Sequence, residues 1–506
     1  MKDLSTMGYE NKVVMIGGGP ATLTAAYELQ KYGESFVPEI FEAGEIVGGI
    51  ARTESHNGYR FDIGGHRFFT KVSEVEEMWK EVLKDDFITR SRMSRIYYRA
   101  RFYDYPLKLV NALSNLGPYE SFRIVISYLK WQVRPYKKQE SFEQWVINRF
   151  GGRLYMHFFR SYTKKVWGID PKEIRADWAA QRIKNLSLFK AVWNAFTGAN
   201  DTVSLIEQFQ YPRLGPGMMW ERTADLIEEN GGQVHTKAAV VGVKHDGGKN
   251  VTAIEVEYWS KDGAAPKRET VTGDNYINSM ALRDLILCMD PPPPAEVIDA
   301  AKKLKYRDFL IVTLMLKDRE PFPDNWIYVH SSDVKVGRIQ NFSAWSPEMV
   351  PDPDTSCVGM EYFCDEGDEL WSMGAEELRA LASKELAHLG LCTEEKVFDA
   401  AVIRQPKAYP VYDSEYADAL EVIKTYLLGF ANFQTVGRNG LHRYNNQDHS
   451  MLSAMYAARN LMGGDYDVWD VNVDQVYHET DDSKPKVKKG HSERLQPQRN
   501  SSKETV

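Results

Sequence analysis

The chain has 506 residues, of which 43% are hydrophobic and 26% charged, a composition that supports large buried cores and excludes a mainly disordered protein. Its 63 Lys and Arg against 71 Asp and Glu give a formal net charge of −8 without a long basic block in the body, so nucleic acid is not expected as a partner. The four cysteines form no CxxC pair, and neither a zinc site nor a disulfide framework is predicted.

The first patterned stretch indicates a strand, a tight glycine turn and a helix. Residues 12–16 (KVVMI) are an apolar run that Gly17 to Pro20 and a helical pattern follow directly. A second strand-like run, 37–41, ends at Glu42, about 20 residues beyond the glycines, which completes a β-α-β unit. Backbone amides at such a helix N-terminus can neutralise a pyrophosphate, and a carboxylate ending the second strand can accept ribose hydroxyls. Thr22 stands where glycine or alanine is usual, which predicts looser packing of helix against strand.

The rest of the chain changes character several times. Aromatic-rich helical patterns from 106 to about 188 indicate an inserted helical domain. The proline run 291–294 marks a boundary, and the final 26 residues hold no aromatic side chain and are predicted to be a disordered tail. Strands are predicted at 234–245, 250–258, 309–316, 326–330, 358–363 and 397–404, with helices at 375–389 and 451–462.

Two further glycine segments, GGIART (48–53) and GYRFDIGGHRFFT (58–70), carry a family resemblance. Together with the first glycine turn they resemble the flavoprotein family of amine oxidases, protoporphyrinogen oxidases, phytoene desaturases and UDP-galactopyranose mutases. Three blocks are similar to the mutases in particular. They are FEQWVINRFG (142–151) with RSYTKKVWGIDPKEIRADWAAQRI (160–183), NWIYV (325–329) with GRIQNFS (337–343), and GRNGLHRYNNQDHS (437–450).

The resemblance implies an α/β fold with a Rossmann-type FAD-binding domain built from residues 1–105, 202–290 and 425–480. A helical insertion domain (106–201), a mixed, mainly antiparallel substrate-binding sheet domain (295–424) and a disordered tail (481–506) complete the expected organisation. It implies a mutase that interconverts the pyranose and furanose forms of a nucleotide-diphosphate sugar, with N5 of reduced FAD as the nucleophile and no net oxidation. The alternative is an FAD-dependent oxidoreductase of the amine oxidase or desaturase type, acting on a glycolipid or isoprenoid diphosphate. NAD(P)H is a candidate electron donor, although a second glycine fingerprint is lacking.

The resemblance also assigns the cofactor site, residue by residue. The expected contacts are the glycine turns, the carboxylate after the second strand, a backbone contact to adenine, and a helix N-terminus near the flavin pyrimidine ring, where negative charge collects on reduction. These positions are Gly17, Gly19, Pro20, Ala21, Glu42, Gly49, Ala51, Arg52, Gly64, Gly65, His66, Val241, Arg438, Asp448, His449 and Ser450. An N-cap by Asp448 or Ser450 is the structural alternative for the last group.

The substrate site follows in the same way. Arg182 and Arg338 match two arginines that clamp the diphosphate, as a doubly charged leaving group requires. With His66 beside the flavin, they are the predicted catalytic residues. The predicted substrate contacts are Tyr105, Thr163, Trp167, Arg182, Trp326, Tyr328, Arg338, Tyr409, Tyr444 and Asn446. Taken singly, such residues are more often surface ion pairs or core aromatics, and Trp167 is as compatible with helix packing as with a pocket wall.

Cellular setting is predicted from what the sequence lacks. The first twelve residues contain no apolar signal segment. Hydrophobic runs such as 122–131 are interrupted by charges and fall short of the ~18 residues that span a bilayer. We therefore expect a cytoplasmic enzyme with a small-molecule substrate.

Overall fold

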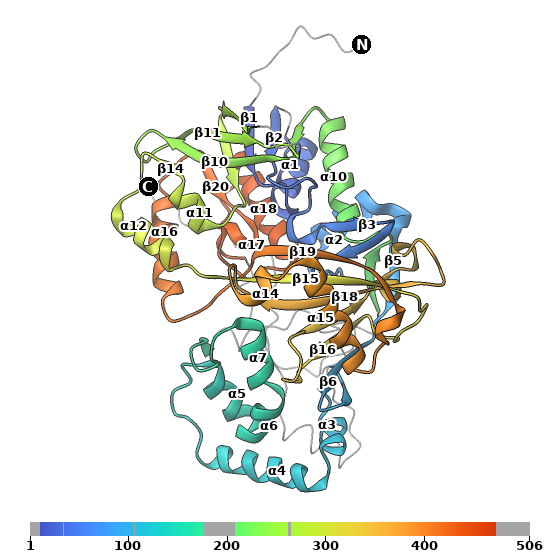
Figure 1. Cartoon of the computed structure of the whole chain (residues 1–506). Helices are drawn as coiled ribbons and strands as arrows, with labels where there is room; N and C mark the ends of the chain where they lie inside the picture. The colour runs from blue at the N-terminus through green and yellow to red at the C-terminus, as the bar shows by residue number, and fades with distance from the viewer. Residues whose placement is uncertain (1–10, 34, 106, 177–207, 262–264, 472–506) are drawn as a thin grey trace.

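The computed structural model describes residues 11–33, 35–105, 107–176, 208–261 and 265–471. Arg182 and the predicted tail lie outside these ranges. In Figure 1 two smaller sheets form the upper part of the molecule, a large sheet crosses the middle, and a group of helices forms the lower end. The mixture of helices and sheets confirms the predicted α/β class.

The first sheet carries the glycine turn. All four of its pairings are parallel, in the order β20-β13-β1-β2-β9, and the last four residues of β1 form a continuous apolar run that is buried, as expected of a parallel strand covered on both faces. Its strands are β1 (Asn11–Ile16), β2 (Phe36–Phe41), β9 (Gln233–His235), β13 (Asn275–Asn278) and β20 (Phe433–Thr435). The helices around this core are α1 (Pro20–Tyr32), α2 (Ser73–Leu83), α10 (Gly217–Glu229), α11 (Leu282–Leu287), α17 (Gly437–Gly440) and α18 (Gln447–Leu461).

A four-stranded sheet lies beside it, in the order β12-β11-β10-β14. Its strands are β10 (Ala238–His245), β11 (Val251–Tyr258), β12 (Lys267–Val271) and β14 (Met289–Asp290). The prediction of a single strand at 234–245 is wrong, because the strand is interrupted between β9 and β10 and the two parts belong to different sheets. Lys237 has a φ of 55° at this break, a left-handed conformation that ends a strand.

The large sheet has seven strands in the order β19-β15-β18-β17-β16-β6-β7. The four strands expected between 309 and 404 are present, and α15 (Ala375–His388), with the short α14 (Glu369–Ser372), packs on one face. The strands are β6 (Ser94–Tyr98), β7 (Arg101–Asp104), β15 (Tyr306–Leu316), β16 (Trp326–Val329), β17 (Arg338–Asn341), β18 (Ser356–Cys364) and β19 (Val397–Pro410). Its other face shares a core with the helical end of the molecule.

The described part of the helical insertion contains five helices: α3 (Leu109–Leu116), α4 (Pro118–Val133), α5 (Phe142–Phe150), α6 (Gly152–Phe158) and α7 (Arg160–Trp167). Local signals set their limits. Ser141 and Gln144 form a capping box at the start of α5, and Gly168 ends α7 in a left-handed conformation with a φ of 71°.

Strand pairing and packing connect segments on the two sides of two expected domain boundaries, and the boundaries themselves stay a prediction. Residues 94–104 pair into the seven-stranded sheet, not with the first segment of the dinucleotide-binding part. Helices α12 (Ala295–Lys303) and α16 (Tyr416–Leu427) pack on each other and into the core of the parallel sheet. Short elements complete the fold: β3 (Thr53–His56), β4 (Tyr59–Asp62), β5 (Phe87–Ser91), β8 (Gln208–Pro212), α13 (Phe342–Trp345), and single turns at Gly49–Ala51, Lys84–Asp86, Pro347–Met349 and Glu394–Lys396.

Candidate functional site

The first glycine turn joins β1 to α1. Gly19 is the N-cap of α1, no side chain caps this end, and Pro20 occupies the first turn, so the helix amides are directed outward. Thr22, the departure from the glycine pattern, is buried and donates its hydroxyl to the Gly17 carbonyl. The threonine hydroxyl is therefore bonded to the turn itself, and the looser packing of helix against strand stays a prediction.

The first and second glycine segments meet at this turn, and we call them together the glycine cradle. A Cβ placed on Gly19 would have only the Gly49 Cα within 4 Å, at 3.9 Å, which is an ordinary contact distance. The Gly48 N–H donates to the Gly18 carbonyl at 2.8 Å and holds the second glycine segment in place. Glu42 accepts the Gly18 N–H at 2.7 Å, which fixes its carboxylate at the turn. These residues fit a dinucleotide pyrophosphate with its ribose beside Glu42.

The Arg52 side chain bonds to the second glycine segment and to its neighbours. Its Nη1 donates to the Gly49 carbonyl and to Gln405 Oε1, each at 2.9 Å, and its Nε pairs with Glu54 at 2.6 Å. Ala51 is fully buried behind the same loop. Arg52 therefore acts as a support for the glycine segment.

The third glycine segment follows β4 and carries His66. Gly64 has a φ of 86°, which favours glycine, and its carbonyl lies 3.0 Å from His66 Nδ1. A carbonyl can only accept, so Nδ1 carries the proton and Nε2 is left as an acceptor. Burial and the Arg438 cation lower the pKa of His66 to about 3, and the imidazole is neutral at physiological pH.

Asp62, at the end of β4, holds the start of the third glycine segment in place through its side chain. It is fully buried and accepts hydrogen bonds from Tyr211 and, at 2.9 Å, from Thr53. Burial raises the pKa of Asp62 to about 7, although both hydrogen bonds act in the opposite direction. No sequence pattern singled out this carboxyl, which holds the strand that leads to the glycines.

Replacing Asp62 with Asn should remove a pH dependence of stability. The folded protein keeps a proton on Asp62 that the unfolded chain loses above about pH 4, so this contribution is full below pH 4 and is lost as the pH rises to about 7. The stability of the wild type relative to Asp62→Asn should therefore fall with rising pH, by at most about 1.4 kcal/mol per pH unit. Urea unfolding of both proteins at several pH values measures the difference, and a constant difference would show that Asp62 ionises normally.

Trp326 joins the glycine segment to the large sheet. Its ring lies against Gly65 so closely that a Cβ there would be 1.2 Å from Trp326 Cζ3, a contact between residues far apart in the chain. The indole N–H is buried and finds no acceptor among the described residues. A buried donor without a protein acceptor is a feature expected beside a ligand.

Arg338, on β17, lies next to this tryptophan. Its guanidinium carbon is 5.5 Å from the Trp326 ring centre and 4.9 Å from that of Phe363. Nε donates to Tyr162 at 3.0 Å, and Nη1 donates to Tyr409 at 3.2 Å and pairs with Glu361 at 3.4 Å. Nη2 has no acceptor among the residues that the structure describes, which leaves one edge of the guanidinium for a ligand.

Glu361 is the counter-charge of Arg338 and was not predicted from sequence. Its side chain is fully buried on β18, and Gln340 donates to it at 2.7 Å. Burial raises the pKa of Glu361, while Arg338 lowers it. For Arg338, burial opposes the charged form, but Tyr162, Tyr409 and Glu361 outweigh it and hold the pKa well above its usual value. The arginine is charged and held in a fixed orientation.

The predicted aromatic residues surround this arginine. Tyr105 stacks on Tyr328 with ring centres 4.3 Å apart, and Tyr409 stacks on Tyr444 at 5.4 Å. Trp167 touches the second pair, at 6.2 Å and 6.1 Å. Arg438 lies 5.1 Å from the Tyr444 ring centre, but its Nε and Nη1 donate to the Asn445 and Ala408 carbonyls. The structure thus assembles most of the predicted substrate residues, drawn from both ends of the chain, into one aromatic cluster.

The N-terminus of α18 differs from the expected position. Asn446 is its N-cap, in a capping box with His449, so the helix begins four residues before the expected start. Asp448, His449 and Ser450 therefore lie in the first turn, and all three are buried. Neither Asp448 nor Ser450 is the cap. Asn446 thus has a structural role as the N-cap of α18. Its predicted contact with substrate stays a prediction.

Three predicted residues remain apart from these groups. Val241 lies at a β-bulge of β10, between Val240 and Gly242, with its side chain partly exposed. Thr163 is buried on α7. Arg182 lies outside the described residues, so a second arginine of the clamp stays a prediction. Tyr162 was missed although it precedes Thr163 in the quoted block, because tyrosines of a helix are usually core residues.

These features together define a flavin-binding class of enzyme: a parallel sheet with a glycine cradle, a second glycine turn beside a neutral histidine, and a charged aromatic cluster next to it. Residues 23–417 match the family of flavin containing amine oxidoreductases, and the chain belongs to this family. The resemblance expected from the glycine segments is confirmed.

Solved structures and sequence relatives agree with this assignment. The fold is similar to that of reduced UDP-galactopyranose mutase, with a TM-score of 0.77 and 21% identity over 90% of this chain and 96% of that one. Putrescine oxidase bound to putrescine gives a TM-score of 0.57 and 16% identity over 90% and 99%. A dTDP-fucopyranose mutase of Escherichia coli is 28% identical over 177 residues, 33% of this chain and 44% of that protein. Coproporphyrinogen III oxidase of Mycobacterium leprae is 35% identical over 69 residues, 13% and 15% of the two chains.

The matched segments cover less than half the length of either sequence relative. Of the four proteins named, two are sugar mutases and two are oxidases.

Proposed function

We propose that the protein is a flavin-dependent mutase that interconverts the pyranose and furanose forms of a nucleotide-diphosphate sugar, with FAD as its cofactor. The observation that carries the proposal is the position of Arg338. A fixed cation, whose Nη2 has no acceptor among the described residues, lies beside Trp326, which itself contacts the glycine turn at Gly65. An anionic ligand bound to this edge would lie next to the flavin region.

Different side chains of this protein would have different roles in such a reaction. Arg338 would hold a phosphate oxygen of the diphosphate through Nη2, with Arg182 as the proposed second cation. The stacked tyrosines would exclude water and orient the sugar. His66, neutral and with Nε2 as acceptor, would receive a hydrogen bond beside the flavin. Reduced FAD supplies a nucleophilic nitrogen, N5, when bound, and NAD(P)H is the proposed source of its electrons.

The oxidoreductase alternative rests on the other relatives. Coproporphyrinogen III oxidase is similar to part of this sequence, and putrescine oxidase has a similar fold over 90% of this chain. An oxidoreductase that acts on a glycolipid or isoprenoid diphosphate would use the same arginine. The two functions differ in whether an electron acceptor is consumed with each product formed.

Anaerobic turnover tests the proposal. Protein reduced with dithionite is incubated without oxygen with UDP-galactopyranose, and in parallel with dTDP-fucopyranose, and the isomers are separated. We expect many turnovers per flavin, a flavin that is still reduced at the end, and no activity of the oxidised protein. Product that forms only in proportion to an added electron acceptor, with the reduced protein inactive on both nucleotide sugars, would replace the mutase by the oxidoreductase.

A further inference from the structure

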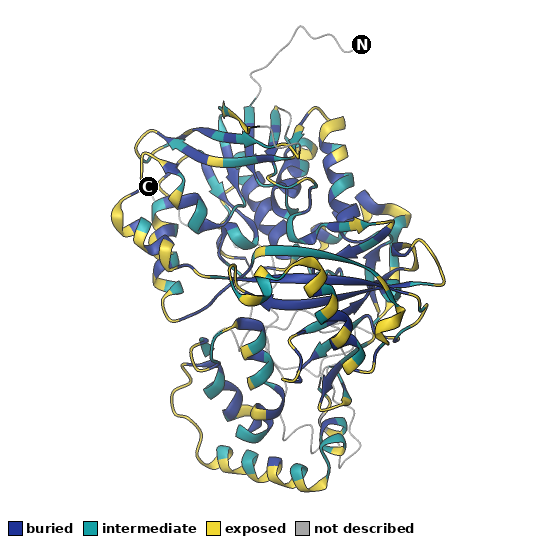
Figure 2. Cartoon of the chain, viewed as in Figure 1, coloured by how far each residue is buried: buried dark blue, intermediate teal, exposed yellow. Residues whose placement is uncertain are grey.

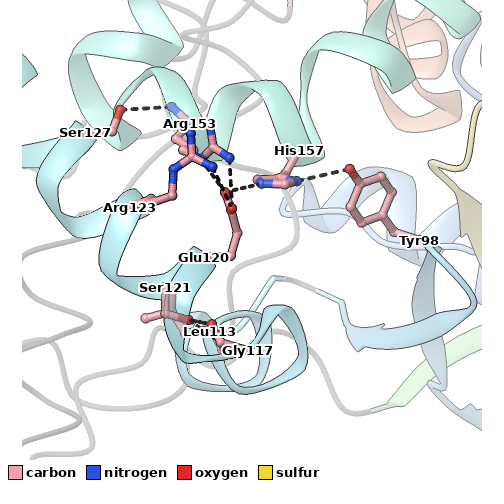
Figure 3. Close-up of polar contacts among 9 residues, drawn as sticks. All are labelled: Tyr98, Leu113, Gly117, Glu120, Ser121, Arg123, Ser127, Arg153 and His157. Atoms are coloured by element: carbon pink, nitrogen blue, oxygen red, sulfur yellow. Dashed lines mark hydrogen bonds and ion pairs between the residues drawn. The ribbon is translucent and has the colours of Figure 1, made fainter.

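Helix α4 lies along the outer edge of the helical end, and polar contacts hold its inner side (Figure 3). Glu120 accepts hydrogen bonds from Arg153 Nη2 at 2.9 Å and from His157 Nε2 at 2.8 Å. Through Nδ1, His157 also contacts the Tyr98 hydroxyl of β6 at 3.1 Å, and Ser127 accepts the Arg153 N–H at 3.1 Å. The hydrogen bond from Arg153 lowers the pKa of Glu120 to about 2, so its carboxylate is charged and turned toward the protein.

The outer side of α4 is apolar, the reverse of an ordinary surface helix. Five large apolar side chains recur at intervals of three or four residues, Ile126 adjoins one of them, and Ile124 is the one residue of the helix that is fully buried. Tyr119, Phe122 and Val133 are 73%, 65% and 79% exposed, and Figure 2 shows the exposed colour along this helix. We call this surface the α4 apolar stripe. It consists of Tyr119, Phe122, Val125, Ile126, Leu129 and Val133.

Positive charge flanks the stripe. Residues 118–138 contain five Lys or Arg against the single Glu120, in a chain whose formal charge is −8. Arg123, which also pairs with Glu120 at 3.7 Å, and Lys130 lie on the helix itself, and Arg134, Lys137 and Lys138 follow its end, all of them exposed. Because Glu120 is bonded to the inner side, the outer surface of this segment presents cations and apolar groups together.

Two occupants fit an apolar helix face, and the charges distinguish them. A second copy of the chain, paired through α4, would bring two sets of cations together with no outward carboxylate on the helix to pair with them. An anionic lipid surface matches both features, because the apolar side chains enter the headgroup region and the cations meet lipid phosphates. None of the described helices has the length and hydropathy needed to cross a bilayer, so α4 can only lie on one.

We propose that α4 docks the protein on the surface of an anionic lipid bilayer, through the α4 apolar stripe and the basic residues beside it. The helix lies at the lower tip of the molecule, at the end opposite the parallel sheet (Figure 1). Docking there leaves the glycine cradle and the parallel sheet away from the membrane.

Vesicle flotation with the full chain tests this inference. Vesicles of phosphatidylcholine alone are compared with vesicles in which a third of the lipid is phosphatidylglycerol, at low and high salt. We expect binding to the anionic vesicles that weakens with salt. Each Lys or Arg near the surface contributes about fivefold in affinity, so Lys130→Gln with Arg134→Gln should weaken binding roughly 25-fold. Phe122→Gln with Leu129→Gln should weaken it at least about tenfold.

Matched controls lie on α12 and at the end of α16. Lys302→Gln with Lys303→Gln changes the net charge by as much as Lys130→Gln with Arg134→Gln does. Leu428→Gln replaces a side chain that is 65% exposed, as Phe122 is. Both controls should bind vesicles as the wild type does, and circular dichroism should show all variants folded. Equal binding to neutral and anionic vesicles, or equal effects of the controls, would overturn the proposal. So would a dimer in sedimentation that Phe122→Gln with Leu129→Gln dissociates, in the absence of lipid binding.

Discussion

Replacing Gly19 with Val is expected to give a folded but colourless protein. Gly19 has extended backbone angles, with a φ of −87° and a ψ of −179°, which a β-branched residue adopts without strain. Apart from the Gly49 Cα at 3.9 Å, a Cβ there would meet nothing within 4 Å. The protein therefore has room for a Cβ at this position, whereas a side chain here would block the close approach of the backbone to a pyrophosphate at the turn.

Flavin absorbance after purification and thermal unfolding measure this prediction. We expect FAD content to fall to near zero while the unfolding temperature of the apoprotein stays close to that of flavin-stripped wild type. Gly374→Val is a matched control, because Gly374 is also a helix N-cap with a negative φ, at the start of α15. Gly17→Val is a poorer probe, since Gly17 has a φ of 95° and its Cβ would lie 2.5 Å from Ser279 Oγ. Normal FAD content in Gly19→Val would show that the pyrophosphate does not bind at this turn.

The parts of the fold that were predictable are those encoded locally. The strand, glycine turn and helix at the start of the chain follow from consecutive residues, and so does the long apolar strand β15. Strands β6, β7 and β17 are only four or five residues long, too short for an alternation to stand out, and they form only because distant strands offer hydrogen-bond partners. The break between β9 and β10 depends on one backbone conformation at Lys237, a residue type that gives no warning of it.

The site shows the same division between local and distant causes. The glycine segments identified the family, whereas the contact of Trp326 with Gly65 joins a strand of the large sheet to the loop after β4, and no local pattern predicts it. Glu361 carried a usable signal, because a single carboxylate within the apolar run SCVGMEYFC must find a partner when the strand is buried. Which cation it meets is decided by the antiparallel register that sets Arg338 opposite Glu361 on the neighbouring strand.

This pairing leads to a prediction about Arg338→Met. The substitution removes the cation of a fully buried carboxylate, which typically costs about 3 to 5 kcal/mol of stability. If the free Nη2 edge binds a diphosphate, affinity for UDP should also fall by roughly 10 to 150 fold, the effect of losing one charge-assisted contact. Isothermal titration with UDP and urea unfolding measure the two effects, and FAD content should be unchanged.

A second substitution separates the two roles of the arginine. In Arg338→Met combined with Glu361→Gln, no unpaired charge is left in the interior, and the glutamine oxygen can still accept the Gln340 hydrogen bond. Stability should return most of the way to that of the wild type, because the cost came from the isolated carboxylate. Affinity for UDP should not return, because no cation faces the ligand. Recovery of both would mean that Arg338 only neutralises Glu361, and unchanged UDP affinity in Arg338→Met alone would place the diphosphate elsewhere.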